Sequence, residues 1–567
     1  MSDGREAADA IVAILAANGV RELFTMPGDA FPILEAVAGA QADGRPAPRI
    51  VTCLHETVAL AAAHGHHMVS RVPQACLFHV DVGLQMAGGM LHNAQRARAG
   101  VIILGGRTPA TWEGQLRGGR VIDMHWVQDR GDLGGTVRDY VKWSYDLTRT
   151  EPLAHVIQRA ARIAASEPAG PVYVSLLREM LLEEFTGELL DVARQPLPRP
   201  AVPEIGSLEE LADLINAAEH PIAVAGHTGR HPESFAALGD LAHVAAMPVY
   251  TRGARANLSS DHPMHMGTDH GAALGEADLI LLLDVEVPWT PLFHHLRPDA
   301  KVVQIDVDPL KADMGLWSFP ADLTLEGSTA AAMPVLAGLV TERRTHAQEV
   351  KATQRRERVT GLHDAHRASL AQAAARQAGA SPIAVDHLAA CIGELVDDAT
   401  VVVDDCTTAL ATTSQHIPTR TPGSYFQPMG SSMGWGAGAA LGAKLAAPDT
   451  TVISVNAEGN FLSGAPEAAL WSAARMNAPF LSVIFDNAQY AAIKLGLLHE
   501  YPESRLAEAG TALEIEKGPD LVRLAESCGA QAERVEAAGE VRRALRRGMD
   551  AVRGGQCALV DVKVQGL

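Results

Sequence analysis

The stretch from Ser431 to Tyr490 decides the fold of this 567-residue chain. It opens with the small-residue run Ser431-Ser432-Met433-Gly434-Trp435-Gly436-Ala437-Gly438 and closes with Phe485-Asp486-Asn487-Ala488-Gln489-Tyr490. Between these ends, an apolar run leads into Ala457-Glu458-Gly459-Asn460. An apolar run that ends at an oxygen-bearing side chain occurs twice, at Glu458 and at Asn487. This pattern is typical of parallel α/β sheets, which bind ligands at the carboxyl ends of their strands.

The oxygen atoms of this stretch suit a divalent cation held together with a diphosphate. Candidate metal ligands are Glu458, Asn487 and the main-chain carbonyl of Gln489, because Mg²⁺ takes oxygen ligands and is often shared with phosphates. The Gly-rich run from 434 to 438 should open a helix, where unpaired N–H groups attract anions. These residues alone leave another interpretation open, in which Ala-Glu-Gly is only a turn and Asn487 only caps a helix.

Three blocks of the chain repeat the order of apolar strand, turn and helix. Runs of Val, Ile and Leu bounded by Gly or Pro indicate parallel strands buried on both faces. The predicted strands are 22–26, 75–80, 100–104, 171–176, 221–225, 278–283, 301–306, 400–403, 451–455, 480–485 and 558–562. We therefore predict an α/β protein with three doubly wound domains of mostly parallel sheets, at 1–190, 203–340 and 378–567. A Pro-rich linker (195–203) and a charged helical connector (341–376) join them.

Composition excludes several classes of function. Hydrophobic residues make up 47% and charged residues 20% of the chain, as in ordinary globular proteins. The formal net charge of −20 argues against nucleic acid and anionic membranes as partners. No run reaches the roughly 18 apolar residues of a membrane span. The six cysteines form no CxxC pair, which is typical of buried thiols in a reducing compartment, and we expect a soluble, cytoplasmic protein.

Two residues of the first block are further candidates for the site, Glu56 for proton transfer and His79 for its position. Glu56 opens a helix made almost wholly of small apolar residues, so its carboxyl group should be buried and suited to this role. The alternative is a glutamate that only favours the helix start and is open to water. His79 follows the apolar residues 75–78, again at the carboxyl end of a strand. Most of the 23 histidines are expected to be structural.

Taken together, these residues resemble the thiamine-diphosphate-dependent enzymes of the acetolactate synthase, pyruvate oxidase and benzoylformate decarboxylase family. The resemblance covers nearly the whole chain, in the order pyrimidine-binding, central and diphosphate-binding domain. The cofactor motif of the family, Gly-Asp-Gly followed by Asn-Asn, is similar to Ala457-Glu458-Gly459 and Asp486-Asn487. This chain departs from it at Ala457, Glu458 and Asp486.

The resemblance implies roles for single residues. Glu56 would activate the cofactor, His79 and Gln128 would act on the substrate, and Met433 would bend the cofactor. The implied cofactor-binding residues are Ser431, Met433, Gly459, Asn460, Asn487 and Tyr490, and the implied metal ligands are Glu458, Asn487 and Gln489. The implied cofactors are thiamine diphosphate and Mg²⁺. FAD is not expected, because the flavin signatures of the synthases are not apparent in the central block.

The resemblance also implies an activity and an assembly. We expect a lyase, decarboxylase or carboligase that acts on 2-oxo acids or 2-hydroxy carbonyl compounds and is acetolactate synthase-like. The alternatives are a 2-hydroxyacyl-CoA lyase and, from another class, a non-catalytic regulatory paralogue. In the family the site lies between subunits, so a homodimer or homotetramer that binds a small-molecule substrate is expected. Arg252 and Arg255 could meet an ADP group but are more simply solvated surface charges.

Overall fold

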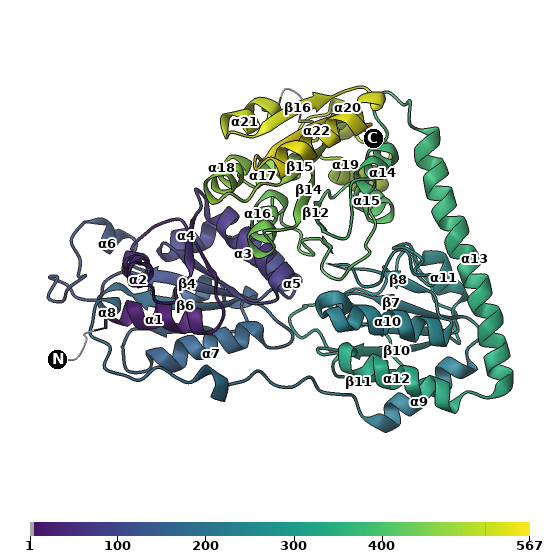
Figure 1. The fold of residues 1–567 in the computed structure, drawn as a ribbon, viewed down its shortest axis with the longest axis horizontal. Helices are drawn as coiled ribbons and strands as arrows, with labels where there is room; N and C mark the ends of the chain where they lie inside the picture. The colour runs from purple at the N-terminus through teal and green to yellow at the C-terminus, as the bar shows by residue number, and fades with distance from the viewer. Residues whose placement is uncertain (1–4, 254, 516–517, 567) are drawn as a thin grey trace.

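The computed structural model describes residues 5–253, 255–515 and 518–566, and its chain forms three sheets in sequence order (Figure 1). The strand orders are β2-β1-β3-β4-β6-β5, β11-β10-β9-β7-β8 and β13-β12-β14-β15-β17-β16. Neighbouring strands within each sheet are parallel. The prediction of three doubly wound α/β domains is therefore confirmed, whereas the boundaries 1–190, 203–340 and 378–567 stay a prediction.

Helices flank the first sheet on both faces. Its strands are β1 (Glu22–Thr25), β2 (Arg49–Thr52), β3 (Gln74–Phe78), β4 (Val101–Arg107), β5 (Ser144–Leu147) and β6 (Val172–Leu177). Its helices are α1 (Ala7–Ala17), α2 (Phe31–Ala42), α3 (Glu56–Ser70), α4 (Val80–Met86), α5 (Gly88–Arg96), α6 (Met124–Val127), α7 (Leu153–Ala165) and α8 (Arg178–Leu181). Two clusters of buried apolar residues cover its two faces, and one of these clusters continues into the third domain.

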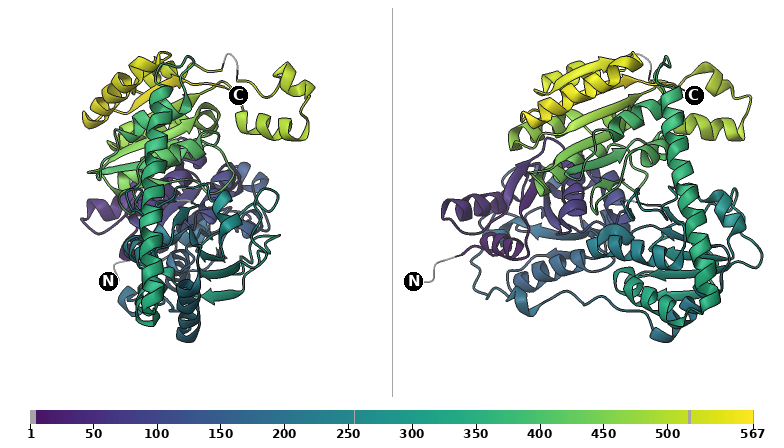
Figure 2. Two further views of the ribbon diagram at one scale, coloured as in Figure 1. Left: turned by 90° about the vertical axis from the view of Figure 1, so that its right-hand side faces the viewer. Right: turned by 45° about the vertical axis from the view of Figure 1, so that its right-hand side comes forward.

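The central sheet is smaller, and a long helix connects it to the last domain. Its strands are β7 (Pro221–Ala225), β8 (Val249–Thr251), β9 (Leu279–Leu283), β10 (Lys301–Asp306) and β11 (Leu323–Glu326). Its helices are α9 (Ile205–Ala217), α10 (Pro232–Ala245), α11 (Gly271–Glu276) and α12 (Thr329–Arg343). The predicted connector is α13 (His346–Arg376), which runs along one side of the molecule (Figures 1 and 2).

The third sheet belongs to the domain that contains residues 431–490, with the Gly-rich run and Glu458. Its strands are β12 (Thr400–Asp405), β13 (Tyr425–Phe426), β14 (Thr451–Ala457), β15 (Leu481–Asp486), β16 (Gln531–Val535) and β17 (Ala558–Lys563). Its helices are α14 (Val385–Gly393), α15 (Leu410–His416), α16 (Gly436–Ala446), α17 (Glu458–Ser463), α18 (Pro466–Met476), α19 (Ala491–Glu500), α20 (Arg505–Ala509), α21 (Leu521–Ser527) and α22 (Val541–Arg553). Figure 2 shows α19 and α20 projecting from this domain.

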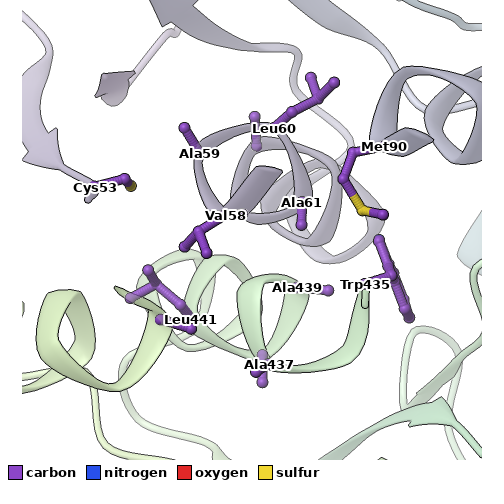
Figure 3. Packing of buried hydrophobic residues seen from close by; sticks show 14 of the residues in the cluster. Cys53, Val58, Ala59, Leu60, Ala61, Met90, Trp435, Ala437, Ala439 and Leu441 are labelled. Atoms are coloured by element: carbon purple, nitrogen blue, oxygen red, sulfur yellow. The ribbon is translucent and has the colours of Figure 1, made fainter. Parts of the chain in front are cut away.

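The first and third domains pack through α3 and α16 (Figure 3). Gly442 of α16 lies so close to the main chain of Ala62 that a Cβ there would overlap it, and Gly65 of α3 approaches Ala439 in the same way. Small residues thus let the two helix backbones touch, and the apolar side chains around them are buried. This packing fixes the helix that starts at Glu56 against the helix that follows the Gly-rich turn.

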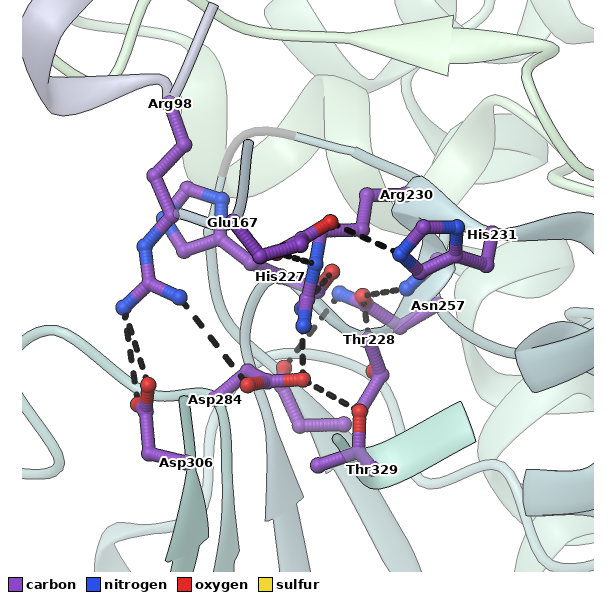
Figure 4. A network of polar contacts seen from close by, with 12 residues as sticks. Arg98, Glu167, His227, Thr228, Arg230, His231, Asn257, Asp284, Asp306 and Thr329 are labelled. Carbon is purple, nitrogen blue, oxygen red and sulfur yellow. Dashed lines mark hydrogen bonds and ion pairs between the residues drawn. The ribbon is translucent and has the colours of Figure 1, made fainter. Parts of the chain in front are cut away.

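Ion pairs join the first domain to the central one (Figure 4). Arg98, which follows α5, pairs with Asp306 at 3.2 Å and with Glu286 at 2.8 Å. Glu167, which follows α7, pairs with Arg230 at 2.8 Å, and Arg230 also pairs with Asp284 at 2.6 Å. These side chains lie near the carboxyl ends of β7, β9 and β10, and the strand order of the central sheet reverses between β7 and β9. Among the described helices, none is both long and apolar enough to cross a membrane.

Candidate functional site

Glu458 and Asn487 follow the neighbouring strands β14 and β15, as the sequence predicts. Glu458 begins α17 and is 3% exposed. Its Oε1 accepts the main-chain N–H of Gln489 at 2.9 Å, and Asn487 Oδ1 accepts the same N–H at 3.0 Å. Oε2 of Glu458 also accepts the N–H of Asn487 at 3.4 Å. The two side-chain oxygen groups therefore converge on one point.

The charge around Glu458 suits a cation. Burial raises the pKa of Glu458 to about 7, and the nearby carboxylate of Asp486 adds to this rise. A cation would stabilise the ionised carboxylate that burial disfavours. Within the described residues, no three or more His, Cys, Asp or Glu side chains are grouped to hold a metal. A metal at Glu458 would therefore also use amide and main-chain oxygen atoms, and such a donor set fits a hard cation such as Mg²⁺.

Two N–H groups of the Gly-rich turn are already paired within the chain, and the binding of a diphosphate at this turn stays a prediction. Asp405, at the end of β12, is buried and accepts the N–H of Trp435 at 2.9 Å and that of Gly436 at 3.0 Å. The start of α16 is thus capped by a carboxylate of the chain itself. The cause is tertiary, because β12 lies beside β14 and brings Asp405 under the turn. Burial raises the pKa of Asp405 to about 7.

Asp405 also links the turn to the motif after β14. Its Oδ1 accepts the side-chain N–H of Asn460 at 2.9 Å, and that same amide donates to the hydroxyl of Thr407 at 3.0 Å. Gly459 lies against the ring of Tyr490, because a Cβ on it would be 3.2 Å from Tyr490 Cε1. The structure thus brings Gly459, Asn460 and Tyr490 together. Sequence reasoning missed Asp405 and Thr407, which stand two and four residues after the predicted strand 400–403.

Glu56 is enclosed by the first domain rather than open to water. It is the first residue of α3 and is 5% exposed. His55 caps the helix, since its Nδ1 accepts the N–H of Thr57 at 3.1 Å. A Cβ on Gly83 of α4 would lie 3.1 Å from Glu56 Oε1. This burial disfavours the alternative of a solvated helix-start glutamate, whereas the catalytic role of Glu56 stays a prediction.

His79 and Gln128 meet through Asp29, which sequence reasoning missed. The main-chain N–H of Asp29 donates to His79 Nδ1 at 3.3 Å, and the Gln128 amide donates to the Asp29 carboxylate. Gly28 lies so close beneath the His79 ring that a Cβ there would overlap it. The turn after β1 therefore determines where both predicted residues stand. The signal for Asp29 was its position shortly after a predicted strand.

The cationic side chain of Arg178 lies beside Asp29. Arg178 Nη1 lies 3.4 Å from Asp29 Oδ1, and His125 Nε2 lies 3.7 Å from Asp29 Oδ2. Burial lowers the pKa of His125, and the charge of Arg178 adds to this effect, so the imidazole is neutral near pH 7. The Asp29 carboxylate thus forms an ion pair with Arg178, next to the residues predicted to meet the substrate.

Comparison with known proteins identifies the family. The model of the N-terminal TPP binding domain of thiamine pyrophosphate enzymes matches residues 5–133, that of the central domain 208–336, and that of the C-terminal TPP binding domain 405–562. The chain belongs to the thiamine pyrophosphate enzymes. The resemblance drawn from its motifs is therefore confirmed at the level of the family, and the chain is identified as a member of an enzyme family.

Several relatives of this thiamine pyrophosphate enzyme align over nearly its full length. It is 24% identical to the acetolactate synthase of Bacillus subtilis over 566 residues, which cover 96% of this chain and 91% of that protein. It is 24% identical to the benzoylformate decarboxylase of Pseudomonas aeruginosa over 531 residues, which cover 91% and 92%. Its fold is similar to that of the thiamine diphosphate-dependent 4-hydroxybenzoylformate decarboxylase of Rhodococcus jostii, with a TM-score of 0.80, 21% identity, and 99% and 100% of the two chains covered.

A cavity of about 570 Å³ lies between the central and third domains. Its lining includes His227, Arg252, Arg255, His270, Ser414 and Tyr425. Arg255 is 5% exposed and donates to the main-chain oxygen of Ala97 at 3.0 Å, and burial lowers its pKa to about 9. Burial also lowers the pKa of Arg252. The interpretation as a solvated surface charge was therefore wrong for Arg255, whose guanidinium group is buried against the first domain, whereas Arg252 is partly exposed.

Proposed function

We propose that this chain is a thiamine diphosphate- and Mg²⁺-dependent lyase, decarboxylase or carboligase that acts on 2-oxo acids or 2-hydroxy carbonyl compounds. The main support is the convergence of the Glu458 and Asn487 oxygen atoms at the ends of β14 and β15, in a chain of this family. Glu458, Asn487 and the carbonyl of Gln489 would hold Mg²⁺. Bound thiamine diphosphate supplies an electron sink for the breaking of a bond next to a carbonyl group.

The cofactor-binding residues proposed here come from three segments of the third domain. Gly459 and Asn460 at the start of α17, Tyr490 before α19, and Ser431 in the Gly-rich loop would surround the cofactor. Met433 would press against it to bend it, and its side chain is 38% exposed, so it is free to make such a contact.

Glu56 and His79 would transfer protons during the reaction. A buried carboxyl group such as that of Glu56 makes strong hydrogen bonds, because the low local dielectric screens them little. His79 Nδ1 accepts the Asp29 N–H, so a neutral His79 ring carries its proton on Nε2, which would face the substrate. Gln128, held by Asp29, would orient a polar group of the substrate.

A second copy of the chain would complete the site, in a homodimer or homotetramer. Large apolar side chains around Glu56 are exposed, with Leu54 at 50%, Val82 at 48% and Met86 at 51%. Exposed apolar residues that cluster at one place mark interaction surfaces. Ile493 and Tyr501 on the projecting α19 segment, each 65% exposed, support a further contact. A cytoplasmic location is part of this proposal, because the six cysteines are free thiols.

The central cavity favours one alternative, a 2-hydroxyacyl-CoA lyase. Arg252 and Arg255 line this cavity, and guanidinium groups bind phosphates well. The cavity would hold the nucleotide part of a thioester substrate. FAD is not part of the proposal.

Incubation of the purified protein with thiamine diphosphate, Mg²⁺ and single substrates tests these proposals. The panel contains 2-oxo acids, aldehydes and 2-hydroxyacyl thioesters, and products are identified by mass. Product from a free 2-oxo acid supports the first proposal, and product only from thioesters supports the alternative. The absence of both turnover and cofactor binding would favour a regulatory paralogue.

A further inference from the structure

A residue of the first domain holds the loop that carries Ser431 and Met433. Asn93 lies on α5 and is fully buried. Its Nδ2 donates to the main-chain oxygen of Ser432 at 2.8 Å, and its Oδ1 accepts the N–H of Ser432 at 3.1 Å. One amide thus satisfies both polar groups of a single loop residue. Two hydrogen bonds in one plane determine the orientation of the main chain at Ser432 as well as its position.

Close packing leaves this loop, residues 430–434, little freedom to shift. A Cβ on Gly430 would lie 2.7 Å from Asn93 Cα. At the other end, Gly434 has a φ of +94°, and a Cβ there would lie 2.6 Å from Gly464 Cα. The loop is therefore clamped between α5 and the turn that ends α17. Any change that displaces Ser432 must displace its neighbour Met433 too.

Ser432 and Met433 differ in how firmly the structure holds them. The main chain of Ser432 is fixed on both sides, whereas the Met433 side chain is half-exposed. We propose that Asn93 is a positioning residue for the cofactor: through Ser432 it fixes where the Met433 side chain meets thiamine diphosphate. This rests on the proposed function. A displacement of about 1 Å in such a site lowers the rate by on the order of 100-fold, so a remote anchor matters.

Cofactor affinity separates this role from mere domain packing. The control for Asn93→Ala is Asn216→Ala, in the central domain. Asn216 is a buried asparagine whose Nδ2 donates to Val340 O at 3.0 Å and whose Oδ1 accepts from Arg344 at 2.9 Å. Both variants lose an amide with two partners, so both lose stability. We expect the Kd for thiamine diphosphate with Mg²⁺, followed by tryptophan fluorescence, to rise at least tenfold in Asn93→Ala only. Asn93→Asp keeps the acceptor for the Ser432 N–H and should lie between the two.

A second variant tests the same proposal if Asn93→Ala folds poorly. Gly430→Ala leaves Asn93 intact but forces the loop away from α5, so it should also raise the Kd at least tenfold. Its control is Gly39→Ala, because a Cβ there meets nothing within 4 Å. If the wild type binds the cofactor and both Asn93→Ala and Gly430→Ala bind equally well, this inference is overturned. If the wild type itself does not bind, the proposed function fails.

Discussion

Glu458 and Asn487 each direct a side-chain oxygen atom at the same main-chain N–H, that of Gln489, at 2.9 and 3.0 Å. The two residues are neighbours in space because β14 and β15 pair in parallel and end at the same edge of the sheet. The longer side chain of a glutamate reaches across to the end of the next strand. With glutamate in place of the aspartate of the family motif, a carboxylate group still lies beside Asn487 and Gln489.

Removal of the Glu458 charge should abolish the effect of Mg²⁺. In Glu458→Gln, the Kd for thiamine diphosphate in the presence of Mg²⁺ should rise at least tenfold, because a neutral amide is a weak ligand for a hard cation. Fluorescence titrations with and without Mg²⁺ measure it. The control is Glu467→Gln, an exposed position on α18. A Glu458→Gln variant that binds as tightly as the wild type would refute the metal site.

Glu56→Gln tests proton transfer without a change of shape. We expect turnover to fall at least 100-fold, because the amide cannot exchange a proton, while the Kd for the cofactor changes less than about fivefold. Steady-state rates and far-UV circular dichroism are measured together. Glu35→Gln, at an exposed position on α2, should behave as the wild type. Turnover within twofold of the wild-type rate would remove Glu56 from the mechanism.

Asp29 and Gln128 should act as one unit. Because the Gln128 amide donates to the Asp29 carboxylate, Asp29→Ala and Gln128→Ala should not have additive effects on kcat/KM. The double-mutant cycle should give a coupling energy of about 0.5 to 3 kcal/mol. Additive effects of the two substitutions would show that the contact does not matter for the reaction.

Asp405 should make stability depend on pH. Burial raises its pKa from 3.8 to about 7, so between these values the native state holds a proton that the unfolded chain has released. Stability therefore falls as pH rises through this window, by up to about 1.4 kcal/mol per pH unit for one group. Denaturant unfolding at pH 4, 5, 6 and 7 should show a shallower fall in Asp405→Asn. Asp398→Asn, an exposed control, should keep the wild-type slope.

The interdomain ion pairs should be sensitive to the loss of Arg98. Arg98→Met leaves Asp306 and Glu286 with one cation fewer in a buried place, which costs about 3 kcal/mol. The cost is at the low end for such losses, because Lys311 still pairs with Asp306 at 2.6 Å. The exposed pair of Arg45 with Asp43 provides the control, where Arg45→Met should cost less than about 1 kcal/mol. Urea midpoints that fall equally in both variants would contradict this account.

The sequence determined the inner strands of all three sheets. Each of the eleven predicted strands is present in the structure, and the six that were not predicted, β2, β5, β8, β11, β13 and β16, are the edges of the sheets. Inner strands are buried on both faces and therefore appear as unbroken apolar runs. Edge strands face water on one side, so β16 carries Gln531, Glu533 and Arg534, and no such run reveals it.

The sequence also placed Glu458, Asn487, Glu56 and His79 at the ends of strands or starts of helices, because those positions follow from local pattern alone. Only the tertiary structure decided what surrounds them. Asp405 reaches the Gly-rich turn across 30 residues, Gln128 reaches Asp29 across 99, and Asn93 reaches Ser432 across 339. The first two bonds depend on how strands and loops pack within one domain and the third on how two domains pack, and the local sequence around either partner does not specify that packing.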